Sequence, residues 1–214
     1  MRERVFGTAL SRAERYAELL TSIGVGRGLI GPREADRIWD RHLLNCAVVG
    51  EALPPDCSVC DVGSGAGLPG IPLALVRPDV AITLVEPSQR RVAFLEEVLG
   101  ELGLTGVSVV RSRAEDLAGQ LTVDRVVARA VAPLERLARW SLPLVSPDGS
   151  LLALKGSRAE VELAEAAEAL RRYGAGDGQI ERYGVGLLER PTTVVRVARA
   201  ARPGDVSRRR KGSV

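Results

Sequence analysis

Apolar residues along this chain alternate between short dense runs and longer stretches at helical spacing. The dense runs, rich in valine, isoleucine and leucine, predict strands at 59–62, 80–85, 107–110, 124–128 and 150–154. Between them apolar residues recur every three or four positions, as in the stretch that follows Ser88 and ends at Gly103. Strands separated by helices indicate βαβ units, so we predict an α/β fold with a doubly wound, mainly parallel sheet.

The last two apolar runs have no helical stretch between them. They cover 178–183 and 192–198, and strands joined so directly are expected to pair antiparallel, as a hairpin. Helical spacing precedes them over 134–144 and then to about Arg172, from a capping-box pattern formed by Ser157 and Glu160. The expected sheet therefore has seven strands.

The first 52 residues predict helices only. Ser11 and Glu14 form another capping-box pattern, which predicts the start of the first helix. The apolar face of that helix consists of Ala13, Tyr16, Ala17 and Leu20. After a glycine-rich break, Pro32 suits the first turn of a second helix. We expect helices over 1–52 packed on an α/β domain over 53–200, followed by a basic tail over 201–214.

Composition indicates an ordinary globular protein, with 45% hydrophobic and 27% charged residues. No apolar run approaches the ~18 residues of a membrane span, and the first residues lack an apolar signal core, so we expect a cytoplasmic protein that does not contact membranes. Cys57 and Cys60 have the C-x-x-C spacing of a half zinc site or a redox pair. Because Cys60 falls in the first strand and no second pair exists, we interpret both as structural and expect no metal.

The net charge of +3 is distributed unevenly along the chain. From Arg199 onward six basic residues face one acidic residue, which gives that end +5 and leaves −2 on the preceding residues. A basic tail on a nearly neutral body is typical of an arm that contacts RNA, and it is equally typical of a solubilising end. Only 3% of residues are aromatic, which argues against extended base stacking.

The most informative segment is the glycine-rich turn that follows the first strand. It reads Asp61-x-Gly63-x-Gly65-x-Gly67 and leads into a helix, as in the first nucleotide-binding turn of a doubly wound sheet. Glycines allow the sharp turn and let a ligand approach the backbone. The acid before the loop resembles the first motif of S-adenosylmethionine-dependent methyltransferases.

The same loop also fits the dinucleotide pattern G-x-G-x-x-G through Gly65, Gly67 and Gly70. Glu86, at the tip of the second strand, could accept hydrogen bonds from ribose hydroxyls of either cofactor. An NAD-dependent reductase therefore stays an alternative, although the chain lacks a Tyr-x-x-x-Lys pair. A non-catalytic RNA-binding protein that keeps a relic pocket is a further alternative.

Five segments together resemble one family. They are Arg41-His42-Leu-Leu-Asn-Cys46, 61–72, 112–117, 128–132 and Ala153-Leu-Lys155-Gly156. The chain is similar in them to the bacterial small-subunit ribosomal RNA guanine-N7 methyltransferases, also called the glucose-inhibited division protein B family. The resemblance implies S-adenosylmethionine as cofactor and 16S ribosomal RNA, free or in the small ribosomal subunit, as partner. It implies methylation at N7 of one guanine in the decoding-region loop.

Carried over by position, the resemblance assigns cofactor contacts to Gly63, Leu68, Ala114, Glu115 and Arg129. The loop argument adds Gly65 and Gly67, and the ribose argument adds Glu86. We expect substrate contacts at Arg41, His42, Asn45, Lys155, Arg208, Arg209 and Arg210. Many relatives have Asp-Ser where this chain has Asn45-Cys46, which removes a carboxylate from the substrate side.

Guanine N7 carries a lone pair and no proton at neutral pH. Methyl transfer to it needs alignment of donor and acceptor and no general base, so we expect no catalytic residue in the usual sense. The sequence also lacks the motifs of adenine-N6 and cytosine-C5 enzymes. We expect a monomer.

Overall fold

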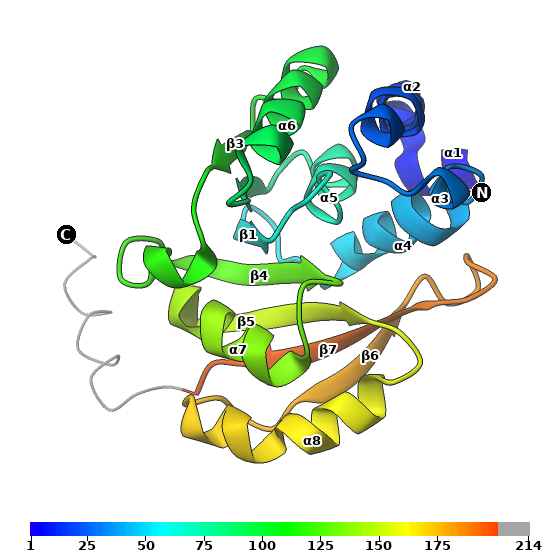
Figure 1. The fold of residues 1–214 in the computed structure, drawn as a ribbon. Helices are drawn as coiled ribbons and strands as arrows, with labels where there is room; N and C mark the ends of the chain where they lie inside the picture. The colour runs from blue at the N-terminus through cyan, green and yellow to red at the C-terminus, as the bar shows by residue number, and fades with distance from the viewer. Residues whose placement is uncertain (201–214) are drawn as a thin grey trace, which may run out of the picture.

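A computed structural model of the chain describes residues 1–200 (Figure 1). Its centre is a seven-stranded sheet with the order β3-β2-β1-β4-β5-β7-β6. The strands are β1 (Ser58–Val62), β2 (Ala81–Val85), β3 (Val107–Val110), β4 (Val123–Arg129), β5 (Val145–Lys155), β6 (Gln179–Tyr183) and β7 (Thr192–Ala198). The strands β1 to β5 pair parallel, whereas β7 runs antiparallel to both β5 and β6. The predicted doubly wound sheet and its closing hairpin are confirmed.

Helices cover both faces of this sheet, and each face has its own hydrophobic core. The helices are α1 (Arg2–Phe6), α2 (Leu10–Leu19), α3 (Pro32–Ala35), α4 (Leu44–Ala47), α5 (Gly70–Val76), α6 (Gln89–Leu102), α7 (Leu134–Ser141) and α8 (Ala159–Arg172). One core joins the N-terminal helices to α5 and α6, and the other joins α7 and α8 to the opposite face. Neighbouring residues of β1 point to opposite faces, because Val59 belongs to the first core and Cys60 to the second.

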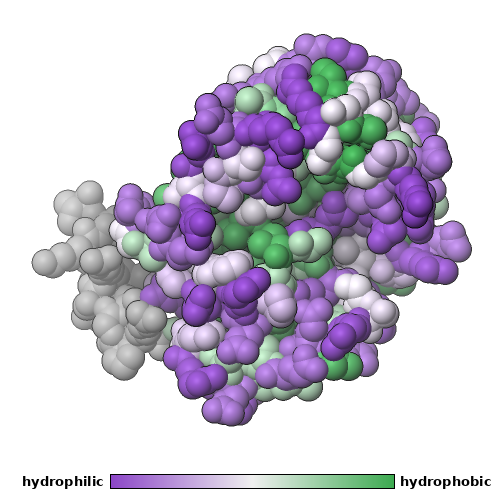
Figure 2. Space-filling model, viewed as in Figure 1, coloured by the Kyte–Doolittle hydropathy of each residue, from purple (hydrophilic) through white to green (hydrophobic). Residues whose placement is uncertain are grey.

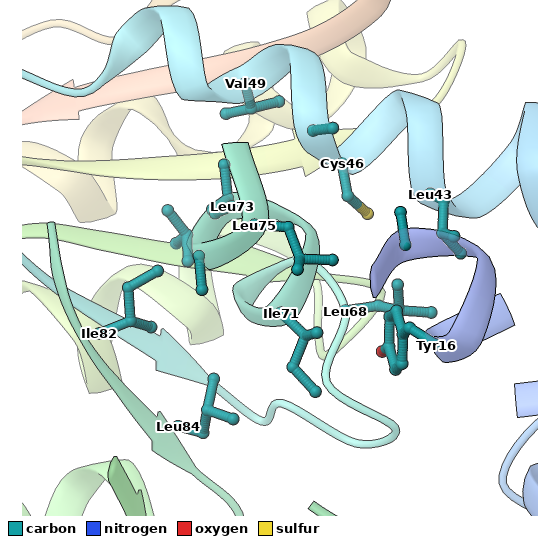
Figure 3. Close-up of a cluster of buried hydrophobic side chains, with 14 of the residues drawn as sticks. Tyr16, Leu43, Cys46, Val49, Leu68, Ile71, Leu73, Leu75, Ile82 and Leu84 are labelled. Atoms are coloured by element: carbon teal, nitrogen blue, oxygen red, sulfur yellow. The ribbon is translucent and has the colours of Figure 1, made fainter. Parts of the chain in front are cut away.

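The N-terminal helices are built into the first core. The predicted apolar face of α2 is buried, and Tyr16 lies beside Leu68 and Ile71 (Figure 3). Cys46 and Val49 pack against α5 from the following helical segment (Figure 3). In the view of Figure 2 the surface is mostly hydrophilic, and hydrophobic side chains gather in the hollow between α6 and α7. The segment 1–52 thus shares its core with the α/β part of the chain.

Both predicted capping boxes are wrong. Ser11 lies inside α2, which begins at Leu10 directly after a 3-10 turn (Gly7–Ala9), so the backbone there is already helical and cannot adopt the extended cap conformation. The cap of α8 is Arg158 rather than Ser157, and neither helix has a side-chain cap hydrogen bond. Tertiary packing therefore fixes these helix starts.

The second N-terminal helix is also less regular than its apolar spacing predicts. Pro32 begins α3 as expected, but α3 ends at Ala35. A π-helical turn (Ile38–Leu43) that contains His42 then leads into α4, and a 3-10 turn (Val48–Ala52) ends the segment.

Candidate active site

The glycine loop connects the carboxyl end of β1 to α5. Gly63, Gly65 and Gly67 have φ angles of 69°, 60° and 95°, which lie in the left-handed region that side chains disfavour. A Cβ added at Gly63 would come within 2.9 Å of the Val131 side chain. The loop backbone is hydrogen-bonded to the sheet, because the amides of Gly63 and Ser64 both donate to the Val85 carbonyl. These glycines are therefore required by the backbone conformation of the loop itself.

Asp61 lies near the end of β1 and connects the glycine loop to α5 through a hydrogen bond. Its side chain is fully buried, and its Oδ2 accepts a hydrogen bond of 2.9 Å from the Gly70 amide at the start of α5. Its other oxygen, Oδ1, has no hydrogen-bond partner among residues 1–200. Burial raises the pKa of Asp61 to about 7. The acid that marks the motif in the sequence thus ties the loop to the helix.

Glu86 follows β2 and lies under the same loop. Only 1% of its surface is exposed, Oε2 accepts from the Gly65 amide at 3.0 Å, and Oε1 accepts from the Ser88 amide at 2.9 Å. Arg91 lies 3.5 Å from Oε2. Each carboxylate oxygen can accept a second hydrogen bond, so Glu86 keeps the capacity to bind hydroxyl groups.

A pocket of about 500 Å³ opens above the loop and beside Glu86. Of the predicted cofactor residues it is lined by Gly63, Gly65, Leu68, Glu86, Ala114, Glu115 and Arg129. Gly67 does not line it, because that residue is turned towards Tyr16 and Ile71 in the core. The volume lies within the ~300–1,000 Å³ of small-molecule sites.

Sequence reasoning missed several lining residues, and four of them are informative. Leu29 and Ile30 reach the pocket from the glycine-rich segment before α3, and Trp140 reaches it from α7. Arg113 precedes the predicted pair Ala114-Glu115. Arg113 follows a strand that ends at the same sheet edge, which is a signal that could have found it. Nothing local marks the other three.

A larger cleft of about 1,390 Å³ adjoins this pocket. Arg41, Asn45 and Lys155, three of the predicted substrate residues, line it. The two cavities share the segment Arg129 to Val131, which follows β4 and forms the wall between them. Ala130 in this wall has a φ of 56°, a conformation that costs a non-glycine residue about 1–2 kcal/mol. Such strain is concentrated at functional sites.

Arg129 stands between the two cavities with an unused donor. Its Nε is buried and has no hydrogen-bond partner among the described residues. A buried guanidinium donor without an acceptor suits an anionic group such as a carboxylate or phosphate of a ligand. The cofactor contact expected at Arg129 stays a prediction.

Two other cations of the cleft are already engaged. Lys155 donates to the Ala132 carbonyl at 2.9 Å and forms an ion pair of 2.7 Å with Glu162, so it holds the wall segment in place. Arg41 pairs with Glu34 at 3.1 Å, although its side chain is half exposed.

His42 does not line either cavity. It is 7% exposed, and its Nε2 lies 2.7 Å from a carboxylate oxygen of Glu34. Burial, followed by the positive charge of Arg129, lowers the pKa of His42 below its ordinary value, so the ring is neutral at pH 7. Its Nδ1 has no partner within residues 1–200. His42 is thus buried against Glu34 and lines neither cavity, and its predicted substrate contact stays a prediction.

Cys57 and Cys60 are buried and not disulfide-bonded, and the described residues hold no group of three ligating side chains that could bind a metal ion. Within residues 1–200, no helix is both long and apolar enough to span a membrane. Arg208, Arg209 and Arg210 lie outside the described residues.

The comparisons with known proteins agree with this geometry. The family model described as rRNA small subunit methyltransferase G matches residues 9–184. The chain belongs to this family. It is 57% identical over 203 residues to "Ribosomal RNA small subunit methyltransferase G" of Streptomyces avermitilis, across 94% of this chain and 85% of that protein. The protein of that name from Mycobacterium sp. (strain JLS) is 53% identical over 216 residues, across 97% and 96%.

Solved structures show the same fold at low sequence identity. A putative S-adenosylmethionine-dependent methyltransferase from Methanococcus maripaludis superposes with a TM-score of 0.61 at 11% identity, over 90% of this chain and 94% of that one. The TYW2 protein of M. jannaschii in complex with AdoMet gives 0.57 at 16% identity, over 75% and 76%. Family and fold confirm the prediction of an S-adenosylmethionine-dependent rRNA methyltransferase.

Proposed function

We propose that this member of the family transfers the methyl group of S-adenosylmethionine to N7 of a guanine in the decoding-region loop of 16S ribosomal RNA. One observation carries the proposal. The small pocket above the glycine loop and the large cleft meet at the wall Arg129 to Val131. If the cofactor binds on one side of this wall and the guanine base on the other, the methyl group and N7 would meet at the edge of the wall.

The small pocket has the features that S-adenosylmethionine requires. Glu86 would accept hydrogen bonds from the ribose hydroxyls, because it lies at the carboxyl end of β2 and lines the pocket. Arg129, with its unused buried Nε, would bind the carboxylate of the methionine part. Ala114 and Glu115 line the same pocket after β3 and would contact the remainder of the cofactor.

The large cleft would hold the RNA. Arg41, Asn45 and Lys155 line it, as do the exposed residues Arg158 and Arg190. Cations of this kind bind phosphates without regard to sequence and so position the strand. Since Lys155 already pairs with Glu162, we assign it to the support of the wall rather than to the RNA.

The shared wall matches a reaction that needs no general base. S-adenosylmethionine supplies an electrophilic methyl group on a sulfonium centre, and N7 offers its lone pair directly. The wall consists of an arginine, an alanine and a valine, none of which accepts a proton near neutral pH. The chain therefore contributes orientation and electrostatics, by holding the cofactor and the base in line.

The test is a single-turnover methylation of small ribosomal subunits that lack the modification, with a labelled methyl donor, at pH values from 6.5 to 9. We expect a nearly constant rate over this pH range. Reduction of the product RNA followed by treatment with aniline should cleave it at one position, that of the 7-methylguanine. The variant His42→Asn should react at a similar rate with an equally flat pH profile, since His42 is buried and lines neither cavity. A rate that rises tenfold per pH unit, or label in a nucleotide that resists this cleavage, would contradict the N7 assignment.

A further inference from the structure

Tyr16 connects the N-terminal helices to the glycine loop. Its side chain is fully buried in α2, and its hydroxyl donates a hydrogen bond of 2.6 Å to the Ala66 carbonyl. The two residues are 50 positions apart in the chain. Figure 3 shows the ring of Tyr16 against Leu68, at the point where the loop passes α2. This is a specific polar contact in an otherwise apolar interface.

The contact acts on the part of the loop that faces the cofactor pocket. Ala66 lies between Gly65 and Gly67, and both Gly65 and Ala66 line the pocket. The amides of Gly63, Ser64 and Gly65 bond to the sheet or to Glu86, whereas the Tyr16 hydroxyl holds the loop from the side of the N-terminal helices. The packing is tight, because a Cβ added at Gly67 would lie 2.9 Å from the Tyr16 hydroxyl.

We propose that Tyr16 is a positioning residue for the cofactor: it holds the Ala66 carbonyl, and through it the pocket-facing backbone of Gly65 and Ala66, in the shape that binds S-adenosylmethionine. The N-terminal helical segment is then part of the cofactor site, although only Leu29 and Ile30 of that segment reach the pocket itself. This inference rests on the proposed function, because it needs the cofactor to bind above the glycine loop.

The physical reason lies in the Ala66 carbonyl. Ala66 is only 6% exposed, so water cannot readily replace a lost donor. A loop rich in glycine has many alternative backbone conformations, and it would move to satisfy a carbonyl left without a partner. Burial raises the pKa of Tyr16 well above its ordinary value, so the hydroxyl remains a donor at any pH at which the enzyme works.

The test compares Tyr16→Phe with Tyr183→Phe in the full chain. Both substitutions remove a hydroxyl that takes part in hydrogen bonds, but Tyr183 lies on β6, bonds to Glu181 and Arg196, and lines neither cavity. We expect the dissociation constant for S-adenosylmethionine, measured by calorimetry, to rise about tenfold in Tyr16→Phe, as one unsatisfied buried carbonyl predicts. In Tyr183→Phe it should stay within about twofold, while the melting temperature falls in both variants.

A second measurement distinguishes loop positioning from general loss of stability. Amide hydrogen exchange at residues 65–68 should become faster in folded Tyr16→Phe and stay unchanged in Tyr183→Phe. The rate at saturating cofactor should remain close to that of the natural enzyme, because the loss is one of binding. Unchanged affinity and exchange in Tyr16→Phe, with methyl transfer by the natural enzyme intact, would overturn the inference alone. Absence of cofactor binding in the natural enzyme would instead overturn the proposed function.

Discussion

The buried carboxyl of Asp61 should make the stability of this protein depend on pH in an unusual direction. Its pKa is about 7 in the folded chain, against 3.8 for a free aspartate. Between these values the unfolded chain releases the proton and the folded chain keeps it. The contribution of Asp61 to the free energy of unfolding is therefore fully present below about pH 4 and is lost as the pH rises towards 7. This difference between the two pKa values corresponds to about 4 kcal/mol in the free energy of unfolding.

Asp61→Asn isolates this effect. An asparagine oxygen can still accept the hydrogen bond from the Gly70 amide, but the side chain no longer titrates. Carboxylates with lowered pKa, such as Asp124 beside the Ser58 amide and hydroxyl, destabilise the protein as the pH falls, and they are present in both proteins. The difference in unfolding free energy between the natural protein and the variant therefore reports on Asp61.

The assay is urea unfolding of both proteins, followed by circular dichroism, at pH values between 4 and 8. Relative to Asp61→Asn, the natural protein should lose about 4 kcal/mol between pH 4 and 7.5, with most of the change between pH 4.5 and 7. Equal slopes for the two proteins over this range would show that Asp61 titrates normally and would refute the reasoning from its burial.

Two further predictions concern the cofactor and the RNA. Glu86→Gln should weaken S-adenosylmethionine binding by about 1–3 kcal/mol, measured by calorimetry. The NH₂ group of the glutamine would face the Gly65 or Ser88 amide and could not accept a hydrogen bond from it. A dissociation constant that changes by less than twofold would contradict the role of Glu86. Deletion of 203–214, all of which lie outside the described residues, removes four cations. Each phosphate contact contributes about 0.7–0.9 to the slope of log affinity against log salt. The shortened protein should show a flatter slope and an unchanged methylated nucleotide, whereas an identical slope would exclude a role for the tail in RNA binding.

Much of the fold was predictable because its signals are local. The strand at 192–198 and the end of the helix at Gly103 were predicted from neighbouring residues alone, and the structure confirms both. The glycine loop with Glu86 at the next strand tip was predictable for the same reason. In a parallel sheet the carboxyl ends of neighbouring strands meet at one edge, so residues after β1, β2 and β3 must converge.

The tertiary structure decided what depends on contacts between distant segments. Sequence spacing placed Tyr16 on an apolar face, but only packing shows its hydroxyl on the Ala66 carbonyl. The family resemblance suggested His42 as a substrate contact, whereas the fold buries it against Glu34. The division into two cavities by Arg129 to Val131 was also invisible in the sequence. Periodicity fixes which side of an element is buried, and only the packing of whole elements fixes what each buried polar group meets.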